Sequence, residues 1–216
     1  MQNKFISILS ELFSAVIAGM FVQNIMLARA SGLDRTRQMG EDSDERIFLM
    51  LQFFCSLVSS ILFWLIHRYL LPLIDLSGLF GLPEYYSRAF LWPVIMAVVL
   101  SAVFMITFVM VVKLAPYEYV TSAARQLPFA AFNNFLVCVI FVGISNNYGL
   151  GRFLAYTFGS NIGYVLANIA IREGNRKIQN KEIPAAFRGL PATILYLSGL
   201  AMAVYAMSGH DLSSLM

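Results

Sequence analysis

The chain has 216 residues, of which 59% are hydrophobic and only 12% are charged. Soluble domains carry about 25% charged residues, so a water-soluble fold of this size is excluded, because it would expose too much apolar surface. The 15 Lys and Arg against 12 Asp and Glu give a net charge of +3, which is too small to indicate nucleic-acid binding. The composition predicts an integral membrane protein with a single membrane domain over residues 1–216.

Apolar stretches long enough to cross a bilayer as a helix, which takes about 20 residues, occur six times. They cover residues 5–28, 47–70, 91–114, 127–147, 153–171 and 189–208. None alternates with the period of two that membrane strands show. The sequence therefore predicts an all-α bundle of six transmembrane helices. The acidic stretch at residues 40–46 is expected to be a solvated connection between the first two spans.

The basic residues are divided unevenly between the two sides of these spans. The first, third and fifth connections hold 11 of them: Arg29, Arg35, Arg37, Arg46, Lys113, Arg125, Arg172, Arg176, Lys177, Lys181 and Arg188. The opposite side holds four: Lys4, Arg68, Arg88 and Arg152. Because Lys and Arg concentrate in cytoplasmic loops, both termini are predicted to lie outside a cytoplasmic (inner) membrane.

Two pairs of neighbouring amide side chains lie inside predicted spans and away from the span ends. Residues 21–27 read Phe-Val-Gln-Asn-Ile-Met-Leu, and residues 131–137 read Ala-Phe-Asn-Asn-Phe-Leu-Val. At an offset of 110 residues, Gln23 aligns with Asn133 and Asn24 with Asn134. Because three spans separate the pairs, the halves run in opposite directions, as in transporters whose broken helices meet at a central site. The pattern predicts an inverted 3+3 repeat, with halves at about 1–115 and 116–216 and broken first and fourth helices.

The function of the amides stays open at this point, because they can ligate a cation, cap interrupted helices or bond one helix to another. Glu11 is the acidic residue deepest in a span, and it is a candidate for an ion path, for an interface position or for a helix contact. Cys55 and Cys138 are interpreted as small buried hydrophobes. Gly159 and Gly163 are expected to allow a close helix contact. Catalytic residues are not predicted, since no nucleophile–base pair or phosphate-binding loop occurs.

Several motifs resemble the Rnf/Nqr membrane-subunit family. These are Phe21-Val22-Gln23-Asn24 through Ser31-Gly32-Leu33, Leu127-Pro128 through Asn134, Phe158 through Gly163, Ile171-Arg172-Glu173 and Ile183-Pro184 through Arg188-Gly189. The resemblance covers essentially the whole chain, and the outward termini match the RnfA/NqrE branch. It implies a subunit that pairs with an oppositely oriented RnfE/NqrD-like subunit. In the family, such pairs hold a [2Fe-2S] cluster that relays electrons to external flavins, coupled to Na⁺ or H⁺ pumping.

The resemblance also implies which positions would hold the cluster. The family's first ligand, in a Leu-Gly-x-Cys motif, falls on Asp34, and its second, in an Asn-Cys motif, falls on Asn134. Because cluster iron is held by thiolates, with histidine as a known substitute, this chain is expected to bind no cofactor alone. The iron–sulfur cluster and the flavin would then belong to partner subunits.

The resulting hypothesis is a membrane subunit of a redox-driven ion-translocating complex, in which this chain is non-catalytic or accessory. Its pseudo-symmetric centre or ion path would include Gln23, Asn24, Asn133 and Asn134, with Glu11 and Asp34 as lesser candidates. The alternative is an inverted-repeat transporter or channel for a small solute or cation that has no redox function. Expected partners are an RnfE/NqrD-like subunit, other Rnf/Nqr-like redox subunits and the lipid bilayer.

Overall fold

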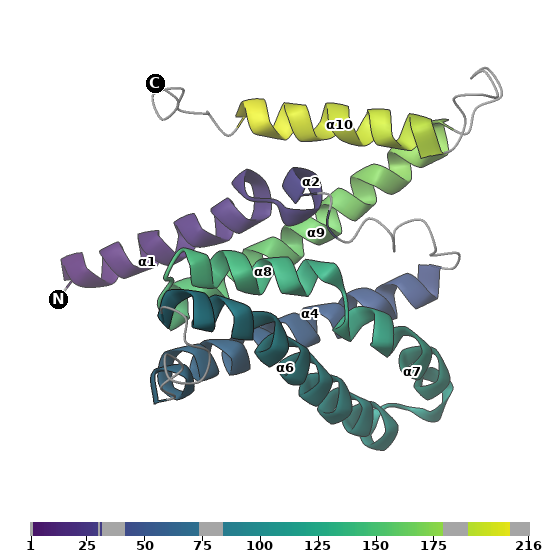
Figure 1. Cartoon of the computed structure of the whole chain (residues 1–216). Coiled ribbons are helices and arrows are strands. Elements are labelled where there is room, and N and C mark those ends of the chain that lie inside the picture. The colour runs from purple at the N-terminus through teal and green to yellow at the C-terminus, as the bar shows by residue number, and fades with distance from the viewer. Residues whose placement is uncertain (1, 30, 32–41, 74–83, 179–189, 208–216) are drawn as a thin grey trace.

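The computed structural model describes residues 2–29, 31, 42–73, 84–178 and 190–207, and its elements are all helical over this part of the chain (Figure 1). The prediction of an all-α fold is confirmed for these residues. In chain order the elements are α1 (Gln2–Ile17), the π-helix η1 (Ala18–Val22), α2 (Ile25–Arg29), α4 (Asp42–Leu65), the π-helix η2 (Ile66–Leu70), the 3-10 turn η3 (Leu71–Leu73), α6 (Glu84–Leu114), α7 (Tyr117–Ala131), α8 (Asn134–Ser145), α9 (Leu150–Ile178) and α10 (Leu190–Met207).

Three helical segments of the described chain are each long and apolar enough to cross a membrane. They are Glu45–Leu73, Leu91–Leu114 and Leu150–Gly174. The pair α7 and α8, bent by 42° at their junction, forms a fourth candidate span. The apolar helices Ile6–Val22 and Pro191–Ala206 are shorter. These helices define a multi-pass membrane protein with three or four candidate spans.

The fourth predicted span differs from the structure at its start. The apolar stretch begins at residue 127, whereas α7 begins at Tyr117, directly after Pro116. Glu118 and Arg125 lower the hydropathy of the first turns of α7, although these residues are helical. The difference arises because a search for consecutive apolar residues finds only the apolar part of a helix. It does not find the more polar turns by which the same helix continues.

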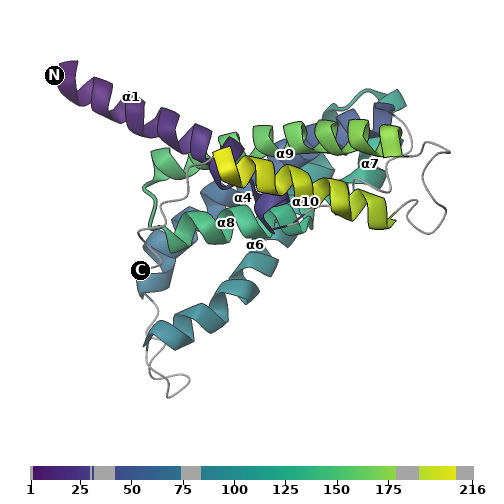
Figure 2. The same cartoon turned by 90° about the horizontal axis from the view of Figure 1, so that it is seen from above.

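The core is built around the crossing of α4 and α9. α1 and η1 lie along α9, while α7 lies along α4, and α6 packs on α4 and α7. α10 covers α9 and α2 at the top of Figure 1. Seen from above, the first turns of α1 and of α6 extend outward from the packed helices (Figure 2). The buried side chains at the centre come from α4, α8 and α9, and include Phe63, Phe135, Leu136, Tyr156 and Tyr164.

Candidate functional site

The first helix is interrupted at the first amide pair. α1 passes into η1, which ends at Val22, and Gln23 leaves the helical conformation with φ −110° and ψ 36°. The Gln23 backbone N–H donates to the carbonyl of Ala18 over 2.7 Å. α2 then begins at Ile25. Since lipid provides no hydrogen bonds, the backbone groups freed at such a break must be satisfied by protein groups.

Asn24 satisfies these groups at the first break. Its Oδ1 accepts from the backbone N–H groups of Met26 at 3.1 Å and Leu27 at 3.2 Å, so it caps α2. Its Nδ2 donates to the carbonyl of Met20 and, across to α9, to the carbonyl of Gly163, both at 3.0 Å. An amide offers two donor and two acceptor positions in this geometry. All four are used, and the side chain is buried.

The fourth helix is interrupted at the second amide pair. Pro128 lies inside the last turns of α7, where it lacks the N–H of a helical residue. Phe132 then leaves the helix with φ −100° and ψ 30°, close to the values at Gln23. Asn133 caps α8, because its Oδ1 accepts from the N–H of Phe135 at 3.0 Å. Its Nδ2 donates to Oε1 of Gln52 in α4 at 2.8 Å.

The two breaks therefore correspond, but one residue away from the alignment made on the sequence. Asn24 and Asn133 are the capping residues, and Ile25 and Asn134 each begin the following helix. The structural offset is 133 − 24 = 109 residues instead of 110. By their capping role Asn24 corresponds to Asn133, whereas the sequence alignment set Asn24 beside Asn134, because the alignment matches amides by type and the cap is fixed by the backbone turn.

The other amide of each pair is left out of the capping. Gln23 is partly buried, and its Oε1 has no hydrogen-bond partner among the described residues. Asn134 is exposed at the start of α8, and its side-chain amide likewise has no partner in the described part of the chain. Each break thus combines one capping amide with one amide that is available to another group.

A strip of polar side chains on α4 and α9 extends from the second break, and the sequence analysis did not predict it. Asn161 Nδ2 donates to Ser56 Oγ at 2.6 Å, and Thr157 Oγ1 donates to Ser60 Oγ at 3.3 Å. Gln52 continues the strip towards Asn133. Gln52, Ser56 and Ser60 are spaced by four residues in α4, and the members on α9 have the same spacing. This spacing in the sequence indicates one polar face on each helix.

The remaining predicted site residues lie elsewhere. Glu11 Oε1 is 3.7 Å from Arg152 Nη1, and both side chains are about half exposed, so the pair links α1 to the start of α9. The Arg152 guanidinium also lies over the ring of Tyr148. Asp34 lies outside the described residues. Cys55 is buried with its Sγ 3.9 Å from Thr107 Oγ1, and Cys138 is a partly buried free thiol.

Glu45 corrects the expectation of a solvated acidic connection at residues 40–46. It belongs to the first turn of α4, it is buried, and it forms an ion pair with Arg172 of α9. The hydrogen bond runs from Arg172 Nη1 to Glu45 Oε2. Because Glu45 is 8% exposed and Arg172 is 49% exposed, the pair fastens the ends of α4 and α9 at the border of the buried core.

Removal of Arg172 is expected to destabilise the protein, since it leaves a buried carboxylate unpaired. We predict that Arg172→Met lowers the free energy of unfolding by about 2–3 kcal/mol, less than in a dry site because water reaches the arginine. Thermal unfolding in mild detergent checks this value. The double variant Arg172→Met/Glu45→Gln should recover part of the loss, and Arg176→Met in the exposed last turn of α9 should change little. Equal losses for both arginines would contradict the pair.

The fold and the site together define a class of protein: a helical membrane protein in which two helices break at paired amides and are capped by buried asparagines. Among the described residues, no three His, Cys, Asp or Glu side chains lie together so that they could hold a metal ion. The arrangement provides two helix breaks, each with one amide side chain that does not take part in capping.

Several known membrane-complex subunits are similar to this chain in sequence. No protein-family model matches the sequence. The chain is 24% identical over 189 residues to the RnfA-type subunit of an ion-translocating oxidoreductase complex from Aromatoleum aromaticum, covering 87% of this chain and 91% of the relative. It is 32% identical over 90 residues, 40% of this chain, to the NqrE-type subunit of a Na⁺-translocating NADH-quinone reductase from Haemophilus influenzae. This match spans 43% of that relative.

A further NqrE-type subunit, from Neisseria meningitidis, is 29% identical over 118 residues, which is 53% of this chain and 57% of the relative. At modest identity, the chain is therefore similar to RnfA-type and NqrE-type subunits of ion-translocating complexes.

Proposed function

We propose that this chain is an integral membrane subunit of a redox-driven ion-translocating complex. The observation that carries the proposal is the similarity to the RnfA-type subunit of an ion-translocating oxidoreductase complex, which extends over 91% of that relative. The multi-pass helical fold is consistent with it. Other subunits of the same complex are then the expected partners, and the chain itself has a non-catalytic or accessory part in the electron transfer.

We propose further that the chain is an inverted 3+3 repeat of six spans, with halves at about 1–115 and 116–216. Reciprocal contacts support this: Asn24 of the first break binds α9, which belongs to the second half, and Asn133 of the second break binds α4, which belongs to the first. The nearly equal backbone angles at Gln23 and Phe132 support it too. The uneven distribution of basic residues favours external termini in the inner membrane, with an oppositely oriented RnfE/NqrD-like subunit beside the chain.

The positions that match the family's cluster ligands do not fit an iron–sulfur cluster. Asn134 presents an amide and Asp34 a carboxylate, whereas cluster iron prefers thiolates. The thiols of this chain do not replace them as a set, since Cys55 is buried against Thr107 of α6. We therefore propose that any cluster or flavin of the complex is held by partner subunits.

The spare amides are the residues we expect to act in coupled transport, because Asn24 and Asn133 are already occupied as caps. We predict that Gln23→Leu/Asn134→Leu inserts normally but lowers redox-driven Na⁺ or H⁺ uptake by membrane vesicles by about tenfold. Ser198→Leu, at an exposed position of α10, is the matched control. Unchanged uptake in the double variant would remove these amides from the ion path. Glu11→Gln, tested alongside, separates an ion-path role of Glu11 from its pairing with Arg152.

The experiment that tests the proposed function is purification of the tagged chain from its native membranes in a mild detergent. Mass spectrometry of the copurifying chains, with an optical and an EPR spectrum of the same sample, provides the readout. Redox subunits with flavin or iron–sulfur signals are the expected result. A colourless protein that purifies alone would overturn it, and would favour a transporter or channel that binds a small solute or cation at the same amides.

A further inference from the structure

Two buried hydroxyl groups of α9 have no hydrogen-bond partner among the described residues. They belong to Tyr156 and Ser160, which are 0% and 2% exposed. The two residues are one helical turn apart, so they share one face of α9. The Tyr156 hydroxyl is close enough to Ser160 to interact with it electrostatically, but the two groups form no hydrogen bond. Since buried hydroxyls without a partner are rare in native proteins, this pair requires an explanation.

The adjacent face of α9 shows how other polar side chains of this helix are satisfied. Thr157 and Asn161 each follow one residue later, and both bond to serines of α4. A serine inside a helix can also donate to the carbonyl one turn earlier, as Ser101 does in α6. Ser160 forms neither kind of bond. The two hydroxyls of α9 therefore need a partner on the side that faces away from α4.

The first helical segment covers that side of α9 without offering a polar side chain. Gly19 of η1 comes so close that an added Cβ would lie 2.9 Å from Ser160 Oγ and 2.6 Å from the Tyr156 carbonyl oxygen. The ring of Tyr148 lies edge-on to the ring of Tyr156, with 5.7 Å between their centroids. Gln23, directly after η1, has another buried oxygen without a partner in the described part of the chain. The junction of η1 with α9 thus encloses unsatisfied polar groups.

The charge near these hydroxyls favours a neutral ligand over a cation. Arg29 of α2 is close enough for its positive charge to act on the Tyr156 hydroxyl, and a positive neighbour repels a bound cation. A hydroxyl can both donate and accept a hydrogen bond, as water can. Internal water molecules typically make about three hydrogen bonds, and their partners are buried polar groups that are otherwise unsatisfied. Water therefore matches the chemistry of this junction.

We propose that the junction of η1 with α9 binds an ordered water molecule that bridges the hydroxyl groups of Tyr156 and Ser160. The site does not depend on the proposed function, because it needs only groups of this chain. It also differs from the capping amides, which satisfy backbone groups at the breaks. The water would supply the polar contact between η1 and α9 that Gly19 does not provide.

Removing one hydroxyl at a time tests the bridge. Tyr156→Phe and Ser160→Ala should each lower the melting temperature in mild detergent by about 2–4 °C, because each removes a hydrogen bond to the water. The double variant should lose less than the sum of the single losses, since either substitution already breaks the bridge. Hydroxyls without water would give a raised or unchanged melting temperature for Tyr156→Phe, because an unsatisfied polar group is removed. That result, or additive losses, would overturn the assignment.

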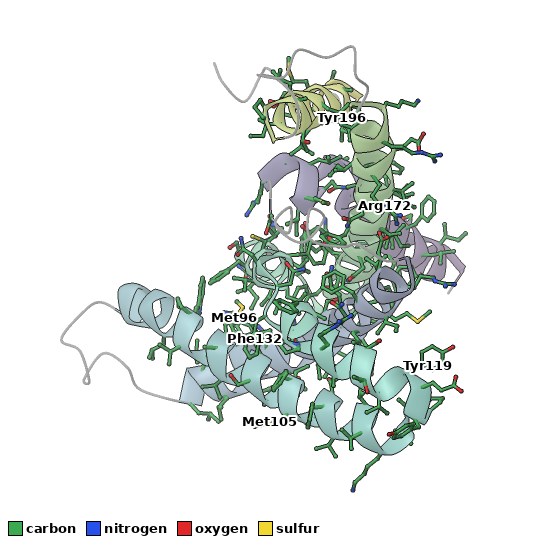
Figure 3. All side chains as sticks on the ribbon, turned by 90° about the vertical axis from the view of Figure 1, so that its right-hand side faces the viewer. Met96, Met105, Tyr119, Phe132, Arg172 and Tyr196 are labelled. Atoms are coloured by element: carbon green, nitrogen blue, oxygen red, sulfur yellow. The ribbon has the colours of Figure 1, made fainter. Side chains whose placement is uncertain are left out.

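Two other tyrosines are matched controls for the loss of a hydroxyl. The Tyr196 hydroxyl donates to the Ala170 carbonyl at 3.1 Å, so Tyr196→Phe should lower the melting temperature about as much as Tyr156→Phe. Tyr119 is 53% exposed, and Tyr119→Phe should leave the melting temperature unchanged. Figure 3 shows Tyr196 where α10 lies against α9, and Tyr119 at the edge of the molecule. Equal shifts for Tyr156→Phe and Tyr119→Phe would contradict the bridge.

X-ray radiolysis detects the water itself, because it produces hydroxyl radicals from water molecules bound beside a side chain. The full chain is irradiated together with the subunits that copurify with it, and oxidised residues are located by mass spectrometry. Tyr156 should be oxidised several-fold more than Phe153, which is equally buried in the same helix but packs against Gly143. Equally low oxidation at both positions would show a dry junction, with the two hydroxyls bonded directly, and would overturn the proposal.

Replacing Na⁺ by choline at constant ionic strength separates water from a cation. The difference in melting temperature between the unmodified chain and Tyr156→Phe should be the same in both salts. A difference that appears only in Na⁺ would assign the site to a cation and overturn the water bridge. Copurification of redox subunits is unaffected by any of these results, so this inference and the proposed function can fail separately.

Discussion

Gly159→Val is expected to give one of the two largest losses of stability, together with Asn24→Asp. Gly159 in α9 meets Val16 in α1, where an added Cβ would lie 2.8 Å from the Val16 Cα and would overlap the Val16 carbonyl. The obstacle is backbone, which cannot rotate away as a side chain can. α1 must then move off α9, and it loses the neighbouring close contacts at Gly19 and Gly163.

We expect a cost of more than about 3 kcal/mol, which is the upper end for overpacked sites. For a chain of this size that corresponds to a fall in melting temperature of roughly 6–12 °C. Fluorescence-detected gel filtration after heating measures this shift without requiring activity. Gly159→Ala should show the same direction with a smaller shift.

Gly199→Ala is the matched control for these variants. Gly199 lies inside α10, and a Cβ there would meet no atom within 4 Å. Because glycine inside a helix is less favourable than alanine by about 0.5–1 kcal/mol, Gly199→Ala should be neutral or slightly stabilising. Equal losses at positions 159 and 199 would show that the close approach of α1 to α9 is not what makes Gly159 necessary.

This glycine contact was predictable from the sequence. Gly159 and Gly163 are four residues apart in an apolar span, and that spacing alone indicates a face on which another helix can lie closely. The partner helix was not predictable, since the spacing says nothing about which of the other spans fills the face. The structure shows that it is the first helical segment, with Val16 of α1 at Gly159 and Met20 of η1 at Gly163.

The breaks were predictable in place but not in detail. Amides beside each other in apolar spans are rare enough to mark an interruption, and both interruptions occur at the marked pairs. Which amide of a pair becomes the cap depends on where the chain leaves the helix, at Gln23 in one case and Phe132 in the other. Composition carries no signal for that one-residue difference.

Long-range polar partners were the part that sequence reasoning missed. Gln52 binds Asn133 from 81 positions away, and Glu45 pairs with Arg172 across 127 positions. Glu45 reads as part of a hydrophilic connection, because a local window does not see the arginine that neutralises it. Such pairs depend on how α4 crosses α9, which is a property of the tertiary fold.

Asn24→Asp is the second substitution with a large expected effect. It separates the hydrogen bonds that the Asn24 oxygen accepts from those that the Asn24 nitrogen donates. Asp retains an oxygen that can accept from the N–H groups of Met26 and Leu27. It loses the Nδ2 that donates to the carbonyls of Met20 and Gly163. A carboxylate then faces two buried carbonyl oxygens, so the substitution keeps the cap of α2 and removes the link to α9.

The expected loss for Asn24→Asp is roughly 3 kcal/mol, because two hydrogen bonds to buried carbonyls worth about 0.5–1.5 kcal/mol each are lost and the carboxylate is then held against the carbonyl oxygens. Thermal unfolding in detergent measures the loss. Asn24→Ser should cost less than Asn24→Asp, since serine also caps helices and adds no charge. Asn134→Ala should leave stability almost unchanged, because its amide serves neither break.

Substitutions at Asn24 and at Asn134 are thus expected to affect different properties, stability in the first case and function in the second. Stability should fall with changes at Asn24, whose four polar contacts hold α2 and α9 together. Ion uptake should fall with changes at Asn134, which is exposed at the start of α8. If Asn24→Asp unfolded at the temperature of the unmodified protein, the first break would not depend on the link from Asn24 to α9, and the assignment of Gln23 as the available amide of that break would lose its basis.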